Sequence, residues 1–175
     1  CSQYPEGTDC MASDAIAHTV GTVRFGPDGK LYVGMGDGAS PFFPDPLALR
    51  AQDLKTYNGK ILRINSDGTA PGDNPFDDGN PNSIRSKVYA HGLRSPYRFS
   101  IHPTTGEVLI GDVGLSKWEE VNRGRGKNFG WPCYEGNGKQ TTFQSTFPGE
   151  CAAVLTSAVT QPIYTYSHND AGAAI

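Results

Sequence analysis

Hydrophobic and polar positions alternate along the chain in short runs that are separated by tight turns. Residues 17–38 read AHTVGTVRFGPDGKLYVGMGDG, where one alternating run ends near Phe25 and the next begins after the Asp28-Gly29 turn. A period of two predicts β-strands, and an Asp-Gly pair between two such runs predicts a hairpin. Further strands are predicted in GKILRINSDG, KVYAHGL and QPIYTYSH. No window sustains the three- and four-residue spacing of an amphipathic helix, so the pattern predicts an all-β chain.

The hairpin has a second copy further along the chain. The run YRFSIHPTTGEVLIGDVG repeats its template after about 76 residues, with Asp112 in the place of Asp37. Long loops, ASPFFPDPLALRAQDLKTYN and TAPGDNPFDDGNPNSIRS, lie between the predicted strands. Repeated four-stranded units are typical of β-propeller blades, and closure of a propeller takes at least four blades. The chain has residues for two to three, so we expect a partial β-propeller.

Composition narrows the class of partner. The 22 glycines and 13 prolines in 175 residues suit short strands joined by turns. The chain carries 15 basic and 18 acidic residues, a net charge of −3, with neither sign in a long run. This excludes an extended nucleic-acid or anionic-membrane surface and favours a small molecule or a protein as partner. No apolar run approaches the roughly 20 residues of a membrane span, and the N-terminus lacks a signal pattern, so any export signal is expected outside the segment.

The four cysteines predict disulfides rather than a metal site. They form two pairs in sequence, Cys1 with Cys10 and Cys133 with Cys151, without the spacing of a zinc knuckle. Of three connectivities, the one within these pairs closes the shortest loops and is preferred, although spacing alone leaves the others open. Disulfides indicate an oxidising compartment, and hence a secreted or periplasmic protein.

Four longer runs carry a family resemblance. HTVGTVRFGPDGKLYVGMGDG, GKILRINSDGTAPGDNPF, VYAHGLRSPYRFSIHPTTGEVLIGDVG and EEVNRGRGKNFGWPCYEG together resemble the glucose/sorbosone dehydrogenase family, the soluble quinoprotein sugar dehydrogenases. The resemblance extends in register from about His18 to Glu135. It implies that residues 1–175 are a segment of one six-bladed propeller domain. It also implies oxidation of an aldose with hydride transfer to pyrroloquinoline quinone, with calcium as a second cofactor.

The resemblance implies roles for individual residues. His18 matches the family's catalytic histidine, Asp37 the aspartate bonded to it, and Arg94 an arginine against cofactor and substrate oxygens. His18, Arg94 and Ser95 are thereby expected to bind the quinone. Ser95 replaces an asparagine of the family pattern, and Ala17 replaces an acidic residue of the glucose-oxidising relatives.

The resemblance also implies two calcium sites. Gly114 and Leu115 match a motif that holds the calcium touching the quinone through backbone carbonyls, although Leu115 replaces a proline. Glu120 and the carbonyl of Phe129 match the ligands of a second, structural calcium. Calcium takes six to eight oxygen ligands, more than these residues supply.

The chemistry of these side chains suits the implied reaction. A neutral imidazole accepts a hydroxyl proton near pH 7, and a carboxylate on its other nitrogen fixes the tautomer. A guanidinium and a divalent cation stabilise negative charge on the acceptor. The sequence does not indicate the electron acceptor that regenerates the quinone.

Each residue also has a simpler interpretation. His18 is alternatively a strand-edge histidine, Asp37 part of a turn, and Arg94 a structural arginine that ties down loop carbonyls. Glu119 and Glu120 resemble a solvated acidic pair, and Trp131 with Phe129 is expected to be core packing. A second functional class therefore stays open, a non-catalytic extracellular propeller that binds a protein or glycan. A propeller lactonase with a catalytic metal is a third, without a carboxylate cluster in the sequence that singles it out.

Overall fold

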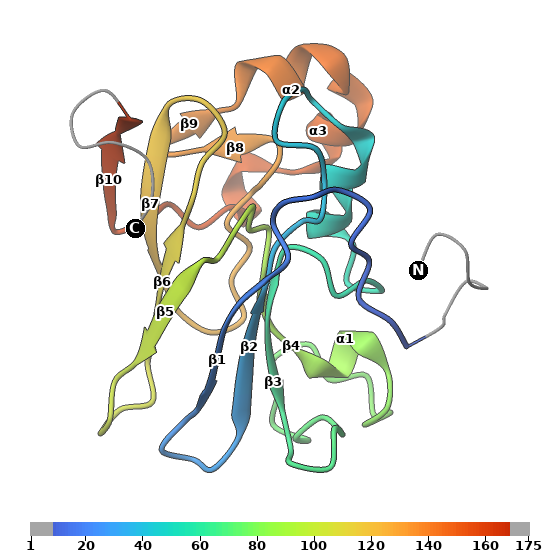
Figure 1. Cartoon of the computed structure of the whole chain (residues 1–175), viewed down its shortest axis with the longest axis vertical. Coiled ribbons are helices and arrows are strands. Elements are labelled where there is room, and N and C mark those ends of the chain that lie inside the picture. The colour runs from blue at the N-terminus through green and yellow to red at the C-terminus, as the bar shows by residue number, and fades with distance from the viewer. Residues whose placement is uncertain (1–8, 169–175) are drawn as a thin grey trace.

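Two four-stranded antiparallel sheets form the body of the protein (Figure 1). The computed structural model describes residues 9–168. The first sheet has the order β1-β2-β3-β4 and the second the order β10-β7-β6-β5. The strands are β1 Val20–Phe25, β2 Leu31–Met35, β3 Lys60–Ile64, β4 Val88–His91, β5 Arg98–Ile101, β6 Val108–Asp112, β7 Trp118–Arg123 and β10 Tyr164–Ser167. A small ribbon joins β8 Tyr134–Glu135 to β9 Gly138–Lys139.

The sheets confirm the hairpins and the internal repeat. β1 pairs with β2 so that Phe25 faces Leu31, and β5 pairs with β6 so that Ile101 faces Val108. β1 lies next to the start of β5. Thr22 Oγ1 of β1 donates at 2.9 Å to the carbonyl of Tyr97, the residue directly before β5. Two sheets in this relation are two consecutive blades, so the described residues form part of a β-propeller.

The expectation that the chain lacks helices is wrong. Residues 9–168 contain three short α-helices, α1 Ile84–Lys87, α2 Thr141–Thr146 and α3 Pro148–Ala153, together with 3-10 turns at Pro46–Gln52 and Thr156–Ala158. Side-chain caps start α1 and α2, because the Ser83 side chain accepts from the Ser86 amide and the Gln140 side chain from the Phe143 amide. Segments of one or two turns are too short for a helical hydrophobic period to show. No helix of the described residues is long and apolar enough to cross a lipid bilayer.

Alternation along the strands separates the core into layers. Ile61 of β3 faces a cluster between the two sheets, whereas its neighbour Leu62 faces the opposite side of the first sheet. A third cluster lies beneath α2 and α3 and is closed by the Cys133–Cys151 disulfide, which confirms that predicted pairing. The predicted pairing of Cys1 with Cys10 involves Cys1, which lies outside the described range.

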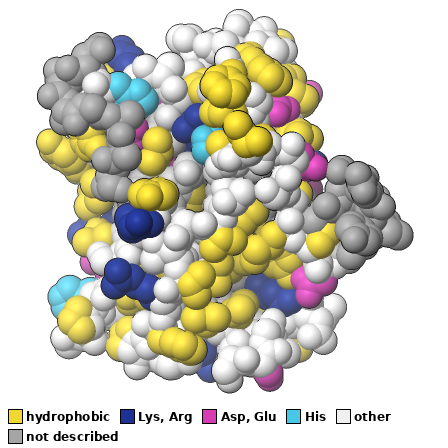
Figure 2. All heavy atoms as spheres, in the orientation of Figure 1, with side chains coloured by type: hydrophobic (Ala, Val, Ile, Leu, Met, Phe, Trp, Pro, Cys, Tyr) yellow, Lys and Arg dark blue, Asp and Glu magenta, His cyan; other side chains and the backbone are white. Residues whose placement is uncertain are grey.

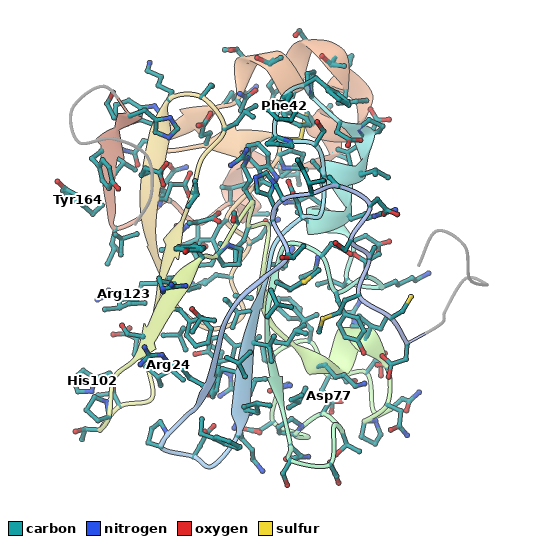
Figure 3. All side chains as sticks on the ribbon, in the orientation of Figure 1. Arg24, Phe42, Asp77, His102, Arg123 and Tyr164 are labelled. Atoms are coloured by element: carbon teal, nitrogen blue, oxygen red, sulfur yellow. A yellow bond between two sulfur atoms is a disulfide. The ribbon has the colours of Figure 1, made fainter. Side chains whose placement is uncertain are left out.

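Several large apolar side chains are exposed on strand faces and loops. Hydrophobic side chains gather in a band on the face seen in Figure 2, and β1 exposes Val20, Val23 and Phe25. Figure 3 places Phe42, from the loop after β2, at the end of the molecule opposite His102 of the β5–β6 turn. The start of β1 and the end of β2 lie toward the Phe42 end (Figure 1 and Figure 3), and this end carries the candidate site.

Candidate active site

The structure brings His18 and Asp37 into direct contact. His18 precedes β1 and Asp37 follows β2, and because these strands are antiparallel the two residues meet at one end of the sheet. His18 Nδ1 lies 2.9 Å from Asp37 Oδ1, and the two side chains are 9% and 2% exposed. A carboxylate only accepts, so in the neutral imidazole Nδ1 carries the hydrogen and Nε2 keeps a lone pair. The side chains that bracket the hairpin therefore form a histidine–carboxylate dyad.

The backbone at His18 is unusual. His18 has φ 57°, the one left-handed residue other than glycine in the described range. Its carbonyl accepts from the Gly38 amide at 3.1 Å. Gly36 lies directly against it, since a Cβ built at Gly36 would be 2.3 Å from the His18 carbonyl oxygen. Gly36 is thus required by close packing against His18, which the turn composition alone did not indicate.

The Asp37 carboxylate is held on both oxygens. Besides His18, Oδ1 accepts from the Ala39 amide at 3.0 Å, and Oδ2 accepts from Trp131 Nε1 at 2.8 Å. Trp131 was expected to be core packing, and its ring does lie in the cluster beneath α2 and α3. Its indole N–H is an additional contact to the site that sequence reasoning missed.

Arg94 is buried next to the dyad. Its carbonyl accepts from the Asp37 amide at 2.8 Å, and its guanidinium lies 5.6 Å from the centre of the Trp131 ring. Nη1 donates to the carbonyls of Val113 and Gly114 at 3.1 and 2.7 Å. Burial lowers the pKa of Arg94, and the carboxylates of Asp37 and Asp112 oppose that shift. The guanidinium therefore does bind loop carbonyls, and Arg94 lies in the same site as the His18–Asp37 dyad.

The second Gly-Asp motif positions Arg94 and Ser95. Asp112 accepts from the Arg94 amide at 3.0 Å and from the Ser95 amide at 2.7 Å. Asp37 and Asp112 are equivalent in the internal repeat, and each binds backbone at the end of its hairpin. The internal repeat is the sequence signal that points to Asp112 as a second backbone-binding carboxylate.

The loop after β6 is held by a further carboxylate. Glu135 Oε1 accepts from the amides of Ser116, Lys117 and Trp118 at 3.0, 3.0 and 3.2 Å. This loop contains Gly114 and Leu115, so Glu135 fixes the segment expected to hold the calcium at the quinone. A three-fold contact of this kind has no signature in sequence.

Glu119 and Glu120 are not a solvated pair, which corrects that alternative. Their exposed fractions are 0% and 7%, and they lie in β7 opposite the end of β6. Burial is the main cause that raises the pKa of Glu119 to about 7 and that of Glu120 to about 8. Burial also raises the pKa of Asp112 to about 7. Adjacent carboxylates contribute to each shift, because ionising these neighbouring buried groups together is unfavourable.

The oxygen-bearing side chains of β7 are of a type that can bind a cation. Among residues 9–168, Asn122 Oδ1 is buried without a hydrogen-bond donor, and Glu119 Oε1 lies 2.7 Å from His168 Nε2. Glu120 accepts from Asn122 Nδ2 at 2.9 Å and from the Gly136 amide. In the described range, no three side chains of the His, Cys, Asp or Glu type converge to hold a metal ion. A cation here would depend on backbone carbonyls and amide oxygens as well.

The two expected calcium sites differ in how closely their residues meet. Gly114 and Leu115 lie in one loop, and the Gly114 carbonyl already accepts from Arg94. Phe129 packs in the cluster between the sheets, and its amide donates to the His91 carbonyl at 3.0 Å. No hydrogen bond of the described residues joins Phe129 to Glu120.

The fold and the site together define a class, propeller proteins with a histidine–carboxylate dyad and a buried arginine at one end of the blades. The chain belongs to the Glucose / Sorbosone dehydrogenase family, whose pattern it matches over residues 9–174.

Similar sequences and structures support this placement. The chain is 31% identical over 178 residues to the HIPL1 protein of Arabidopsis thaliana, covering 91% of this chain and 25% of that protein. It is 33% identical over 128 residues to quinoprotein glucose dehydrogenase B of Acinetobacter calcoaceticus, covering 66% and 26%. The PQQ-bound aldose sugar dehydrogenase of Streptomyces coelicolor superposes with a TM-score of 0.65 at 28% identity, covering 90% of this chain and 38% of that chain. The chain thus spans about a quarter to two fifths of these proteins.

Proposed function

We propose that the chain is a segment of a quinoprotein sugar dehydrogenase that oxidises an aldose at its anomeric hydroxyl. The observation that carries the proposal is the 2.9 Å contact between His18 Nδ1 and Asp37 Oδ1 beside buried Arg94. Family membership supports it, as does the similarity to an aldose sugar dehydrogenase solved with PQQ.

His18 acts as the general base of this proposal. Its Nε2 lone pair accepts the proton of the anomeric hydroxyl while hydride leaves the carbon that bears this hydroxyl. Asp37 keeps Nδ1 protonated, holds the ring in place and stabilises the imidazolium as it forms. Both roles follow from one hydrogen bond, because it fixes the tautomer and the orientation together.

Arg94 provides an anion site for the cofactor. Among the described residues only Nη1 of its guanidinium has acceptors, which leaves Nε and Nη2 for the oxygens of an anionic ring system. Pyrroloquinoline quinone, when bound, supplies the acceptor for hydride. Ser95, whose amide is fixed by Asp112, is the neighbouring contact.

The calcium ligands belong to the same proposal. The carbonyls of Gly114 and Leu115 would hold the ion at the quinone, and Glu120 with the Phe129 carbonyl a second ion. The buried carboxyl groups of β7 support a cation in this region, as does the Asn122 oxygen, which has no donor among the described residues.

We further propose that residues 1–175 belong to one propeller domain of a secreted or periplasmic protein. The exposed apolar side chains of β1 support further blades packed on this segment, and the Cys133–Cys151 disulfide supports an oxidising compartment.

Dye reduction by the full-length protein tests the function. The protein is supplied with the quinone and calcium and assayed with a panel of aldoses. We expect reduction with at least one aldose and a loss of roughly 100-fold or more in His18→Ala. His102→Ala, in the exposed β5–β6 turn, is the matched control and should retain full activity. Absence of reduction by the intact protein, or equal rates in His18→Ala, would refute the proposal.

A non-catalytic extracellular propeller is the second candidate. Ala17 and Ser95 depart from the enzyme pattern that the family resemblance implies. This candidate predicts that the full-length protein binds no quinone at saturating calcium. Isothermal titration calorimetry with the quinone separates the enzyme from the non-catalytic propeller. The enzyme must bind the quinone, and Arg94→Gln should weaken that binding.

A further inference from the structure

We propose that Trp131 is a positioning residue that holds the Asp37 carboxylate on His18 and thereby sets which His18 nitrogen carries the hydrogen. The positioning is a property of the described residues themselves, whereas its consequence for catalysis rests on the proposed function.

The contact fixes the carboxylate at its second oxygen. Oδ1 of Asp37 binds His18 and the Ala39 amide, while Trp131 Nε1 at 2.8 Å is the one donor to Oδ2 among the described residues. A carboxylate held at one oxygen can still rotate about its terminal torsion, but with both oxygens bonded its plane is fixed. Without the indole N–H, Oδ2 is buried without a donor, and a rotated carboxylate no longer presents Oδ1 to His18.

Trp131 is itself held rigidly. Its ring is 4% exposed and packs edge-to-face against Phe143, with 5.2 Å between ring centres. Its amide donates to the Gly92 carbonyl at 3.0 Å, and its carbonyl accepts from Gln52 Nε2 at 2.7 Å. The Gln52 amide also pairs with Asn128, which lies three residues before Trp131. The indole is therefore a fixed donor to which Asp37 conforms.

Packing alone does not explain this arrangement. A buried ring needs an acceptor for its N–H, but a backbone carbonyl would serve as well as a carboxylate. The acceptor here is the carboxylate that binds His18, and the same ring lies beneath the Arg94 guanidinium. Trp131 thus contacts both the partner of the base and the proposed cofactor arginine.

The direct test is the tautomer of His18 in Trp131→Phe. Phenylalanine keeps an aromatic ring in the cluster and removes the N–H. Long-range proton–nitrogen NMR at mildly alkaline pH reports which ring nitrogen is protonated, and His18→Gln assigns the signal. We expect a single Nδ1-protonated form in the wild type and in the control Trp118→Phe, whose indole N–H has no side-chain acceptor among the described residues. Trp131→Phe should show a mixture of tautomers.

A second measurement leaves Trp131 in place. The Trp131 indole proton resonance, distinguished from that of Trp118 by Trp118→Phe, should move in Asp37→Asn because the acceptor loses its charge, whereas the Trp118 resonance should not. This keeps the proposal testable if Trp131→Phe folds poorly. An unmoved Trp131 resonance would overturn it.

Kinetics separate this proposal from the proposed function. In an active full-length protein, Trp131→Phe should lower kcat roughly tenfold while KM stays within about twofold. A lower free energy of unfolding with unchanged His18 tautomer and unchanged kcat would reduce Trp131 to core packing and overturn the inference. A tautomer change in a protein that oxidises no aldose would instead support the positioning and refute the function.

Discussion

Replacing Gly36 by Ala adds one methyl group against the backbone of His18. The new Cβ would lie 2.3 Å from the His18 carbonyl oxygen and 2.8 Å from the His18 Cβ, whereas contacts below 3.0 Å are essentially never seen. The obstructing atoms are mainly backbone, so the hairpin end must move by more than half an ångström. Overpacking of this kind costs about 1–3 kcal/mol, and we expect the upper half of that range.

The same displacement should reduce activity. A misplacement of about 1 Å can cost roughly 100-fold in rate, so kcat of the full-length Gly36→Ala protein should fall by at least tenfold. Urea unfolding followed by near-ultraviolet circular dichroism gives the stability, and dye reduction gives the rate. Gly72→Ala is the matched control, because a Cβ there meets nothing within 4 Å and its φ is not left-handed. If both variants unfold at the same urea concentration and reduce dye equally, the packing of Gly36 on His18 is not as described.

Three further predictions concern the support of the site. Lys60 is fully buried and donates to three backbone carbonyls, so Lys60→Met should lose about 3 kcal/mol in urea unfolding, and a loss below about 1 kcal/mol would contradict the assignment. Burial lowers the pKa of His91 to about 4, with a smaller contribution from the nearby charge of Lys60. The free energy of unfolding is therefore retained above pH 6.5 and falls as the pH drops toward 4, by about 2 kcal/mol at pH 5. His91→Gln should flatten this part of the pH profile while exposed His102→Gln should not, and equal slopes would refute the cause. Reduction of Cys133–Cys151 should cost about 3 kcal/mol, and an unchanged urea midpoint under reductant would contradict a stabilising role.

Local patterns were enough to predict the strands and the hairpin contact. The run around Asp28-Gly29 has the alternation and turn chemistry of a hairpin, and antiparallel pairing alone brings residues before the first strand and after the second to one end. The contact of His18 with Asp37 was therefore predictable before the structure. The short helices were not, because α2 depends on its Gln140 cap, and both α2 and α3 pack in the cluster with Trp131 and the disulfide rather than showing a hydrophobic period.

The residues that sequence reasoning missed act across long separations. Trp131 reaches Asp37 over 94 positions, and the run in which it lies shows only an aromatic residue before a proline. Glu119 and Glu120 look solvated in sequence because two adjacent carboxylates usually are, and the packing of β7 between β6 and β10 buries them. Tertiary contacts of this kind decide burial and partners, and local composition does not report them.

The most direct measurement is kcat of full-length Asp37→Asn at saturating aldose, with quinone and calcium bound. Asp37 joins His18, Trp131 and the Ala39 amide, so an amide in its place keeps the shape but removes the charge and offers an N–H where acceptors are needed. We predict a loss of roughly 100-fold or more in kcat with quinone affinity retained. A kcat within about threefold of the wild type would contradict a dyad at this site.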